Sequence, residues 1–179
     1  MSDSKVTIHM VASLDGFIAK HDGSVDWMHS KDTYPPGLEM SEEYINEYLA
    51  GIHCYMMGSK TYDHAMKLGW PYGDKPVVVL TSRRLVSDQK SVSFYSGDLP
   101  ELVTNLRSKY QNIWMVGGTN LTKAFLQQGL ADEIVYTIVP VILGDGLLFF
   151  DYIGREVPLH LKDVTTFKDG MVELTYDIT

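Results

Sequence analysis

The sequence predicts an α/β fold in which a mainly parallel sheet finishes in antiparallel strands. The segment from Pro76 to Leu80 contains a continuous Val-Val-Val-Leu run, which is typical of a parallel strand buried on both faces. Similar apolar runs alternate with segments of helical spacing up to Gly129. Beyond Gly129 the chain consists of strand-like segments joined by turns, which indicates antiparallel pairing at the end of the sheet.

The composition is that of one globular domain. The chain has 179 residues, 45% of them hydrophobic, so we expect residues 1–179 to form a single domain. A formal charge of −8 and the lack of a Lys/Arg cluster argue against nucleic-acid or membrane partners. Cys54 is the only cysteine and is expected to fill core space, and the histidines show no metal-ligand spacing, so no metal is expected. The polar start Ser2-Asp3-Ser4-Lys5 and the lack of a long apolar run predict a cytoplasmic protein.

The first half of the chain is expected to alternate strands with helices. Ser41 is a plausible N-cap followed by the acidic residues Glu42 and Glu43, so it opens a helix. The expected elements are a strand at 6–14, this helix at 41–52, a short strand at 54–57, a helix at 60–67 and a strand at 76–80.

The second half is expected to complete the parallel part and to add the antiparallel strands. Pro100 suits the first turn of a helix, and Gly129 is a natural C-terminal stop. The expected elements are a weak strand at 92–95, a helix at 100–109, a strand ending in Gly117-Gly118, a helix at 121–128, and strands at 133–141, 147–150, 160–167 and 171–177. The apolar run 147–150 is expected to be either core or interface.

The motif Trp114-Met115-Val116-Gly117-Gly118-Thr119-Asn120 is the first indication of a ligand. An apolar strand that ends in paired glycines and opens a helix presents backbone N–H groups and the positive end of the helix dipole, where a phosphate binds favourably. The same glycine pair also serves as a plain tight turn, so the motif alone leaves both interpretations open.

Two further polar segments follow predicted strands at equivalent places. Gly58-Ser59-Lys60-Thr61 and Thr81-Ser82-Arg83-Arg84 offer hydroxyl groups and cations that bind phosphate. In an open parallel sheet, ligands bind outside the carboxyl ends of the strands. Taken singly, Lys60 and Arg83 are ordinary surface charges, but three such segments together predict a dinucleotide site, without the common G-x-G-x-x-G fingerprint.

These motifs, in this order, resemble the dihydrofolate reductase superfamily. The resemblance rests on 10–19 (MVASLDGFIA), 26–27 (DW), 57–62 (MGSKTY), 80–83 (LTSR), 116–118 (VGG), 132–134 (DEI) and 140–146 (PVILGDG). The opening Leu-Asp-Gly-Phe-Ile-Ala and the Pro-Val-Ile-Leu-Gly-Asp-Gly segment are more similar to the branch that includes the reductase domain of riboflavin biosynthesis. The resemblance implies a single three-layer α/β sandwich of the dihydrofolate reductase type.

The resemblance also implies an oxidoreductase that uses NADPH. It places Gly58, Lys60 and Thr61 at the pyrophosphate and the 2′-phosphate, and Thr81, Ser82 and Arg83 on the adenosine side. It places Gly117, Gly118 and Thr119 at the pyrophosphate, with the two glycines often joined by a cis peptide, and Ala12 and Ile18 near the nicotinamide. Lys60 stands where arginine is frequent in the family, so a compact ammonium group replaces a planar guanidinium that could bind phosphate through two hydrogen bonds.

The substrate side offers two candidates for a catalytic acid. Folate reductases keep an acidic residue in the helix before the glycine-basic-Thr segment. Counting back from Gly58 leads to Glu42 or Glu43, whereas counting on from Trp27 leads to Asp32. We prefer Glu42, although acidic residues at a helix start are also favoured by the dipole alone. Residues 33–40 form an insertion relative to short folate enzymes and should reshape the substrate pocket.

Three functions therefore stay open. The first is reduction of a small nitrogen heterocycle, for example 5-amino-6-(5-phosphoribosylamino)uracil as in riboflavin biosynthesis. The alternatives are dihydrofolate reduction, which Gly16 and the insertion disfavour, and a non-catalytic NADPH-binding protein. Members of the riboflavin branch often dimerise, so we expect a homodimer. Asp15, directly after a strand, is expected to have a turn role.

Overall fold

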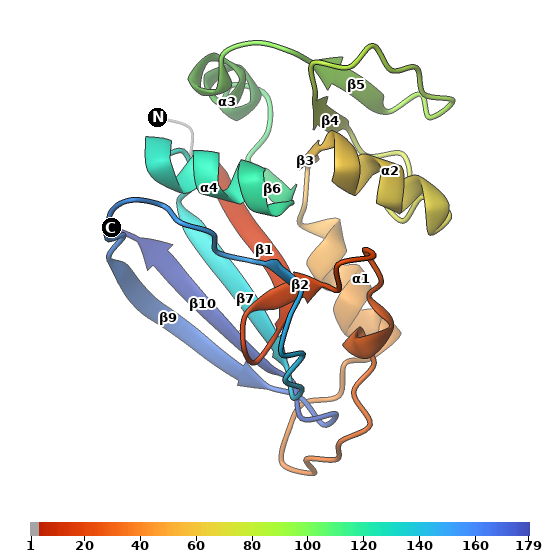
Figure 1. The fold of residues 1–179 in the computed structure, drawn as a ribbon, viewed down its shortest axis with the longest axis vertical. Helices are drawn as coiled ribbons and strands as arrows, with labels where there is room; N and C mark the ends of the chain where they lie inside the picture. Colours follow the sequence, from red (N-terminus) through yellow and green to blue (C-terminus); the bar gives the residue numbers. More distant parts are fainter. Residues whose placement is uncertain (1–3) are drawn as a thin grey trace.

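The computed structural model describes residues 4–179 and follows the alternation of elements expected from the sequence (Figure 1). The first half contains β1 (Lys5–Ser13), β2 (Phe17–Ala19), the short 3-10 helix η1 (Asp26–Met28), α1 (Glu42–Ala50), β3 (Cys54–Gly58), α2 (Ser59–Lys67) and β4 (Val77–Leu80). The second half contains β5 (Val92–Tyr95), α3 (Leu99–Arg107), β6 (Asn112–Gly117), α4 (Thr119–Gln128), β7 (Glu133–Val139), β8 (Leu147–Leu148), β9 (Leu159–Thr166) and β10 (Val172–Ile178).

Eight of the strands form one sheet, in the order β5-β4-β3-β6-β1-β7-β10-β9. The strands from β5 to β7 in this order pair in parallel, whereas β10 is antiparallel to both of its neighbours. The prediction of a mostly parallel sheet with antiparallel C-terminal strands is therefore confirmed. Because parallel strands run the same way, the carboxyl ends of β1, β3, β4 and β6 lie along one edge of the sheet.

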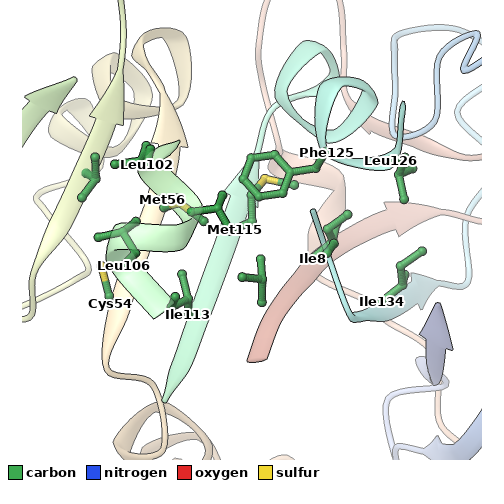
Figure 2. Close-up of a cluster of buried hydrophobic side chains, with 14 of the residues drawn as sticks. Ile8, Cys54, Met56, Leu102, Leu106, Ile113, Met115, Phe125, Leu126 and Ile134 are labelled. Carbon is green, nitrogen blue, oxygen red and sulfur yellow. The ribbon is translucent and has the colours of Figure 1, made fainter. Parts of the chain in front are cut away.

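Helices α3 and α4 cover one face of this sheet. Alternate strand residues such as Ile8, Met56 and Met115 point to this face and pack with Phe125 of α4 in one buried cluster. Figure 2 shows the ring of Phe125 above the strands, between Met115 and Ile8. Cys54 belongs to the same cluster, and burial raises the pKa of its thiol to about 12, so its expected place in the core is confirmed.

Helices α1 and α2 cover part of the opposite face. Tyr55 of β3 and Val77 of β4 form a second buried cluster with Tyr62 of α2, and Leu49 of α1 packs against it. With a helical layer on each face, the molecule is a three-layer α/β sandwich, as the resemblance implied.

The helix ends agree with the sequence signals. The Ser41 hydroxyl accepts a hydrogen bond from the Tyr44 N–H at 3.1 Å, which makes Ser41 the N-cap of α1. Pro100 lies in the first turn of α3, which Asp98 caps. Gly129 ends α4 in the left-handed conformation, with φ of 64°. No helix among residues 4–179 is both long and apolar enough to cross a membrane.

The segment 147–150 differs from its expected form. Only Leu147 and Leu148 are in strand conformation, and they pair with β2, which was not predicted from the sequence. Phe149 is fully buried, whereas its three neighbours are exposed. Gly146 lies so close to the Ala19 carbonyl that a Cβ at this position would overlap it, and glycine permits this approach because it has no side chain. The segment therefore lies beside β2 and outside the main sheet.

Candidate functional site

The first predicted phosphate segment lies at the end of β3. The strand ends at Gly58, which is also the N-cap of α2 and has an extended conformation (φ −79°, ψ 163°). Among residues 4–179, no side chain caps this helix start. The N–H groups of its first turn are therefore available to an anion at the positive end of the helix dipole.

The paired glycines give α4 the same kind of start. Gly117 ends β6 and Gly118 is the N-cap, and the peptide bond between them is cis, as the resemblance implied. Within the described part of the chain, this helix start also has no side-chain cap. The hydroxyl of Thr122, one turn into α4, is buried and finds no hydrogen-bond partner among the described residues.

The two helix starts converge. β3 and β6 are neighbours in the sheet, with Met57 opposite Gly117. A Cβ placed on Gly118 would lie 3.6 Å from the Thr61 hydroxyl of α2, and one on Gly58 would lie 3.9 Å from the Gly117 carbonyl. Two helix N-termini thus meet across backbone that carries no side chain, an arrangement that favours the binding of a pyrophosphate.

The third polar segment adjoins the first. Leu80 at the end of β4 pairs with Gly58, so residues 81–84 begin beside the start of α2. The Thr81 hydroxyl accepts a hydrogen bond from the Arg83 N–H at 3.0 Å, which shapes this loop. The structure therefore brings Gly58, Lys60, Thr61, Thr81, Ser82, Arg83, Gly117 and Gly118 to one edge of the sheet.

The two predicted cations differ in their surroundings. Lys60 is exposed, and its ammonium group has no hydrogen bond or ion pair to residues 4–179. Arg83 instead forms a two-bond ion pair with Asp63 of α2, with Nη1 to Oδ2 at 2.7 Å and Nη2 to Oδ1 at 3.4 Å. The Asp63 carboxylate raises the pKa of the guanidinium through this hydrogen bond. Asp63 carried no signal in the sequence, because its partner lies 20 residues away.

The predicted Thr119 contact is only partly accessible. Its hydroxyl donates a hydrogen bond to the Leu148 carbonyl at 2.6 Å, which fastens β8 to the start of α4. A cofactor contact at Thr119 would therefore use the backbone N–H. No feature of the sequence indicated this tether, since β8 itself was not predicted to leave the main sheet.

Asp15 has a larger role than the turn expected from the sequence. Its carboxylate accepts hydrogen bonds from the Ser13 hydroxyl at 2.6 Å, from the Leu143 N–H at 3.1 Å and from the Gly144 N–H at 2.7 Å. These bonds lower the pKa of Asp15, the one from Ser13 most strongly. Asp15 thus joins the two segments on which the resemblance to the riboflavin-type branch rests, although they are far apart in sequence.

The residues predicted near the nicotinamide lie at this junction. Ala12 is fully buried near the end of β1, and Ile18 is half-buried in β2, just beyond the Asp15 turn. β1 pairs with β6 only as far as Ile8 and Met115, whereas its carboxyl end, including Ala12, pairs with β7 alone. Ala12 therefore lies toward the same sheet edge as the glycine segments, whereas Ile18 belongs to the separate β2–β8 pair that follows β1.

The two predicted acids lie on separate elements. Glu42 is exposed in the first turn of α1, and Asp32 is exposed beside Gly170 in the β9–β10 turn. Neither carboxylate hydrogen-bonds to another residue among 4–179. The structure thus gives neither acid a hydrogen-bond partner that would mark it as catalytic, and the choice between Glu42 and Asp32 stays a prediction.

The insertion at 33–40 is fixed to the tip of the β9–β10 hairpin. The Tyr34 N–H donates to the Lys168 carbonyl at 2.7 Å, and Leu38 exchanges backbone hydrogen bonds with Thr166 and Lys168 at 2.8 and 2.9 Å. A Cβ at Gly37 would overlap the main chain of Phe167. The segment 33–40 is therefore held firmly against this hairpin, and its expected effect on a substrate pocket stays a prediction.

Trp27 packs behind this segment. Its ring contributes to a cluster around Phe167, Met171 and Val139, together with Tyr44 of α1. Trp27 therefore closes an edge of the core, as large aromatic side chains beside loops commonly do. The indole N–H is buried and has no acceptor in the described part of the chain.

Sequence reasoning missed a buried polar network beneath α1. His9 of β1 is 8% exposed and lies 2.6 Å from the Tyr48 hydroxyl and 3.4 Å from that of Thr137. Its ring stacks on Trp114, and the nearest Glu173 oxygen is 3.7 Å from Nε2. Burial lowers the pKa of His9 to about 4, so the ring is neutral at physiological pH. No sequence spacing connects these residues, because five different elements supply them.

A hollow of about 270 Å³ adjoins the network on the side away from the glycine segments. It reaches Lys5 and Asn112, which are the first residues of β1 and β6, so it opens at the amino ends of the strands. Glu133 in its lining is already paired with Lys5 at 2.8 Å and with Lys162 at 2.7 Å. The hollow is therefore separate from the edge where the predicted cofactor residues meet.

Comparison with known proteins identifies the family. A family model described as the RibD C-terminal domain matches residues 4–173. The Bacillus subtilis protein YwjB, which is uncharacterized, is 30% identical over 177 residues, covering 97% of this chain and 98% of its own. The chain therefore belongs to the RibD C-terminal domain family.

Solved structures agree with this assignment. A Shewanella sp. PV-4 protein, provisionally described as a riboflavin biosynthesis protein, superposes with a TM-score of 0.83 at 25% identity, covering 98% of this chain and 99% of its own. The Thermotoga maritima deaminase and 5-amino-6-(5-phosphoribosylamino)uracil reductase gives 0.71 at 17%, with 98% of this chain and 57% of that one. Enterococcus faecalis dihydrofolate reductase, complexed with NADP(H), gives 0.64 at 17%, with 100% and 98% covered. At these last two identities the likeness shows the dihydrofolate reductase-like fold.

Proposed function

We propose that this member of the RibD C-terminal domain family is an NADPH-dependent reductase of a small nitrogen heterocycle, of the type that acts in riboflavin biosynthesis. The observation that carries the proposal is the convergence of the α2 and α4 N-termini at Gly58 and Gly118, where no side chain blocks the approach of a phosphate. The family assignment and the likeness to the Shewanella protein described provisionally as a riboflavin biosynthesis protein support the same conclusion.

The residues present fit NADPH. The first turns of α2 and α4 would hold the pyrophosphate, because their N–H groups and dipoles point to one place. Lys60 and Arg83 would hold the 2′-phosphate, and Ala12 and Ile18 would border the nicotinamide ring. When bound, the cofactor supplies hydride from its nicotinamide, and the protein orients it against the acceptor.

On the substrate side we propose Glu42 as the residue that supplies the proton, with Asp32 as the alternative. The support is the position of Glu42 in the helix that precedes the glycine-basic-Thr segment. Replacement of Glu42 by Gln should then lower kcat about a hundredfold or more, while Asp32→Asn has a small effect. The reverse result would transfer the role to Asp32.

The charges around the insertion bear on the choice of substrate. Lys20 pairs with Asp26 at 2.9 Å, and Lys168 pairs with Glu39 at 2.8 Å. A phosphorylated substrate that used either lysine would have to displace a carboxylate. A substrate panel should therefore contain 5-amino-6-(5-phosphoribosylamino)uracil, its dephosphorylated form, and dihydrofolate.

The experiment combines binding and turnover. Calorimetry should show NADPH binding, and Lys60→Ala should weaken it about tenfold while weakening NADH binding far less, because only NADPH carries the 2′-phosphate. NADPH oxidation with the panel then identifies the acceptor. Turnover of dihydrofolate alone would favour the folate alternative, and binding without any turnover would favour a non-catalytic NADPH-binding protein. Absence of binding to either coenzyme would refute the proposal.

We further propose that the protein acts as a homodimer without nucleic-acid or membrane partners, and in the cytoplasm. Leu147 and Leu148 are 44% and 41% exposed, which leaves apolar surface beside the site for a second copy. Light scattering of the purified protein at micromolar concentration measures the oligomeric state, and a monomer mass would contradict the dimer.

A further inference from the structure

The ion pair between Arg83 and Asp63 lies where the proposed site would meet the adenosine end of the cofactor. Arg83 comes from the loop after β4, and Asp63 from the second turn of α2. The two bonds use both terminal nitrogens of the guanidinium, at 2.7 and 3.4 Å. A phosphate recognised bidentately by arginine uses the same pair of N–H donors.

The same carboxylate also adjoins the other cation. Asp63 follows Lys60 by three residues on α2, and residues with this spacing are neighbours on a helix surface. Asp63 therefore adds a negative charge beside both of the residues that would hold the 2′-phosphate. Its side chain is 40% exposed and that of Arg83 is 48% exposed, so both groups are open to a ligand from solution.

We propose that Asp63 is a residue that determines cofactor specificity, by opposing the 2′-phosphate of NADPH and so narrowing the preference of this protein for NADPH over NADH. The inference rests on the proposed function. NADPH would bring its negatively charged 2′-phosphate to this place, and a carboxylate a few ångströms away would repel it. NADH has a 2′-hydroxyl there, and an acidic side chain accepts a hydrogen bond from such a hydroxyl in many dinucleotide sites.

An exposed ion pair is weak enough to be exchanged when a ligand binds. When NADPH binds, its 2′-phosphate must either displace the Asp63 carboxylate from the Arg83 guanidinium or bind the guanidinium together with it. NADH has no 2′-phosphate and leaves the ion pair intact. Removal of the Asp63 charge should therefore favour NADPH through both effects, namely the loss of repulsion and the release of the guanidinium.

The test measures the dissociation constants of NADPH and NADH by calorimetry for the native protein and for Asp63→Asn. The ratio of the NADH constant to the NADPH constant should rise about threefold to tenfold, and the rise should shrink at high salt. Adenosine 2′,5′-bisphosphate and 5′-AMP should reproduce the change, because they differ only at the 2′-phosphate. Glu156→Gln is the matched control, since it removes one exposed charge far from α2 in sequence and should leave the ratio unchanged.

A ratio that stays constant or falls in Asp63→Asn would overturn the inference, and a fall would show that Asp63 instead positions Arg83 for the phosphate. Asp63→Ser serves as the second variant if the asparagine protein melts at a much lower temperature. A native protein that binds neither coenzyme would refute the proposed function, which is a different result from a constant ratio with measurable binding.

Discussion

The glycine edge and the predicted substrate side of this protein are built in different ways. At the glycine edge, the main chain itself forms the surface, where Gly58 and Gly118 open two helices that meet without side-chain caps. At the predicted substrate side, the insertion at 33–40 is fixed to the β9–β10 turn by backbone hydrogen bonds, and side chains from loops and from α1 pack together beneath it. The difference teaches that a site made of backbone at strand ends is set by topology, whereas a site made of loop side chains depends on contacts between distant segments.

The largest effect that separates the two regions is expected from Gly37→Ala. The added methyl group would overlap the Phe167 main chain, so the insertion must move and lose its backbone pairing with the hairpin. We expect the free energy of unfolding to fall by about 2 to 3 kcal/mol. Denaturant unfolding measures this loss, and NADPH affinity of the folded variant should stay within about twofold. A large loss of NADPH affinity would show that the two regions are coupled.

The next effect concerns pH and the network beneath α1. The folded pKa of His9, about 4, lies below its ordinary value of 6.5, so the unfolded chain binds more protons between these values. Stability is therefore lost as the pH falls through this window, by about 2 kcal/mol at pH 5 for this group alone.

Unfolding curves of the native protein and of His9→Gln at pH 7.5 and 5 isolate the contribution of His9. The native protein should lose more stability than the variant between the two pH values. Burial raises the pKa of Glu173, which also faces this network, but that residue is present in both proteins. His160→Gln, at an exposed histidine of β9, is the control and should behave like the native protein. Equal losses in native protein and His9→Gln would contradict the assigned neutral state of His9.

The smallest change is expected from Gly118→Ala, and it bears on the glycine edge alone. The new Cβ would be in ordinary contact with Thr61 at 3.6 Å, and the backbone has φ of −86°, so the fold should tolerate alanine. The methyl group would nevertheless occupy the space for the pyrophosphate, and NADPH affinity should fall about tenfold, or about 1.4 kcal/mol. Calorimetry together with a melting curve checks both expectations. An unchanged NADPH affinity would indicate that the glycine pair is only a tight turn and does not contact the pyrophosphate.

The sequence predicted the parallel sheet, the helix caps and the grouping of the three polar segments, because each depends on local signals and on the direction of neighbouring strands. Ser41, Pro100 and Gly129 act within one helical turn, so their effects are visible in the sequence. The β2–β8 pair was missed because it depends on the close approach of Gly146 to Ala19, which is a contact between separate loops.

The site was predictable to a smaller extent. Gly58, Gly117 and Gly118 lie at one edge because topology fixes strand ends. The carboxylates of Asp15 and Asp63 could not be assigned, since their partners lie far along the chain and only the folded structure brings them together. Aspartates at a turn and on an exposed helix surface look alike in a sequence, whether or not they have such partners.

The stacking of Trp114 on His9 gives the molecule a natural optical reporter. The ring centroids are 4.8 Å apart and the planes are inclined by 22°. Indole fluorescence is quenched by a protonated imidazole at contact and much less by a neutral one, so the emission of Trp114 follows the charge on its neighbour. An acid titration read by fluorescence would then detect proton entry beneath α1 without any added dye.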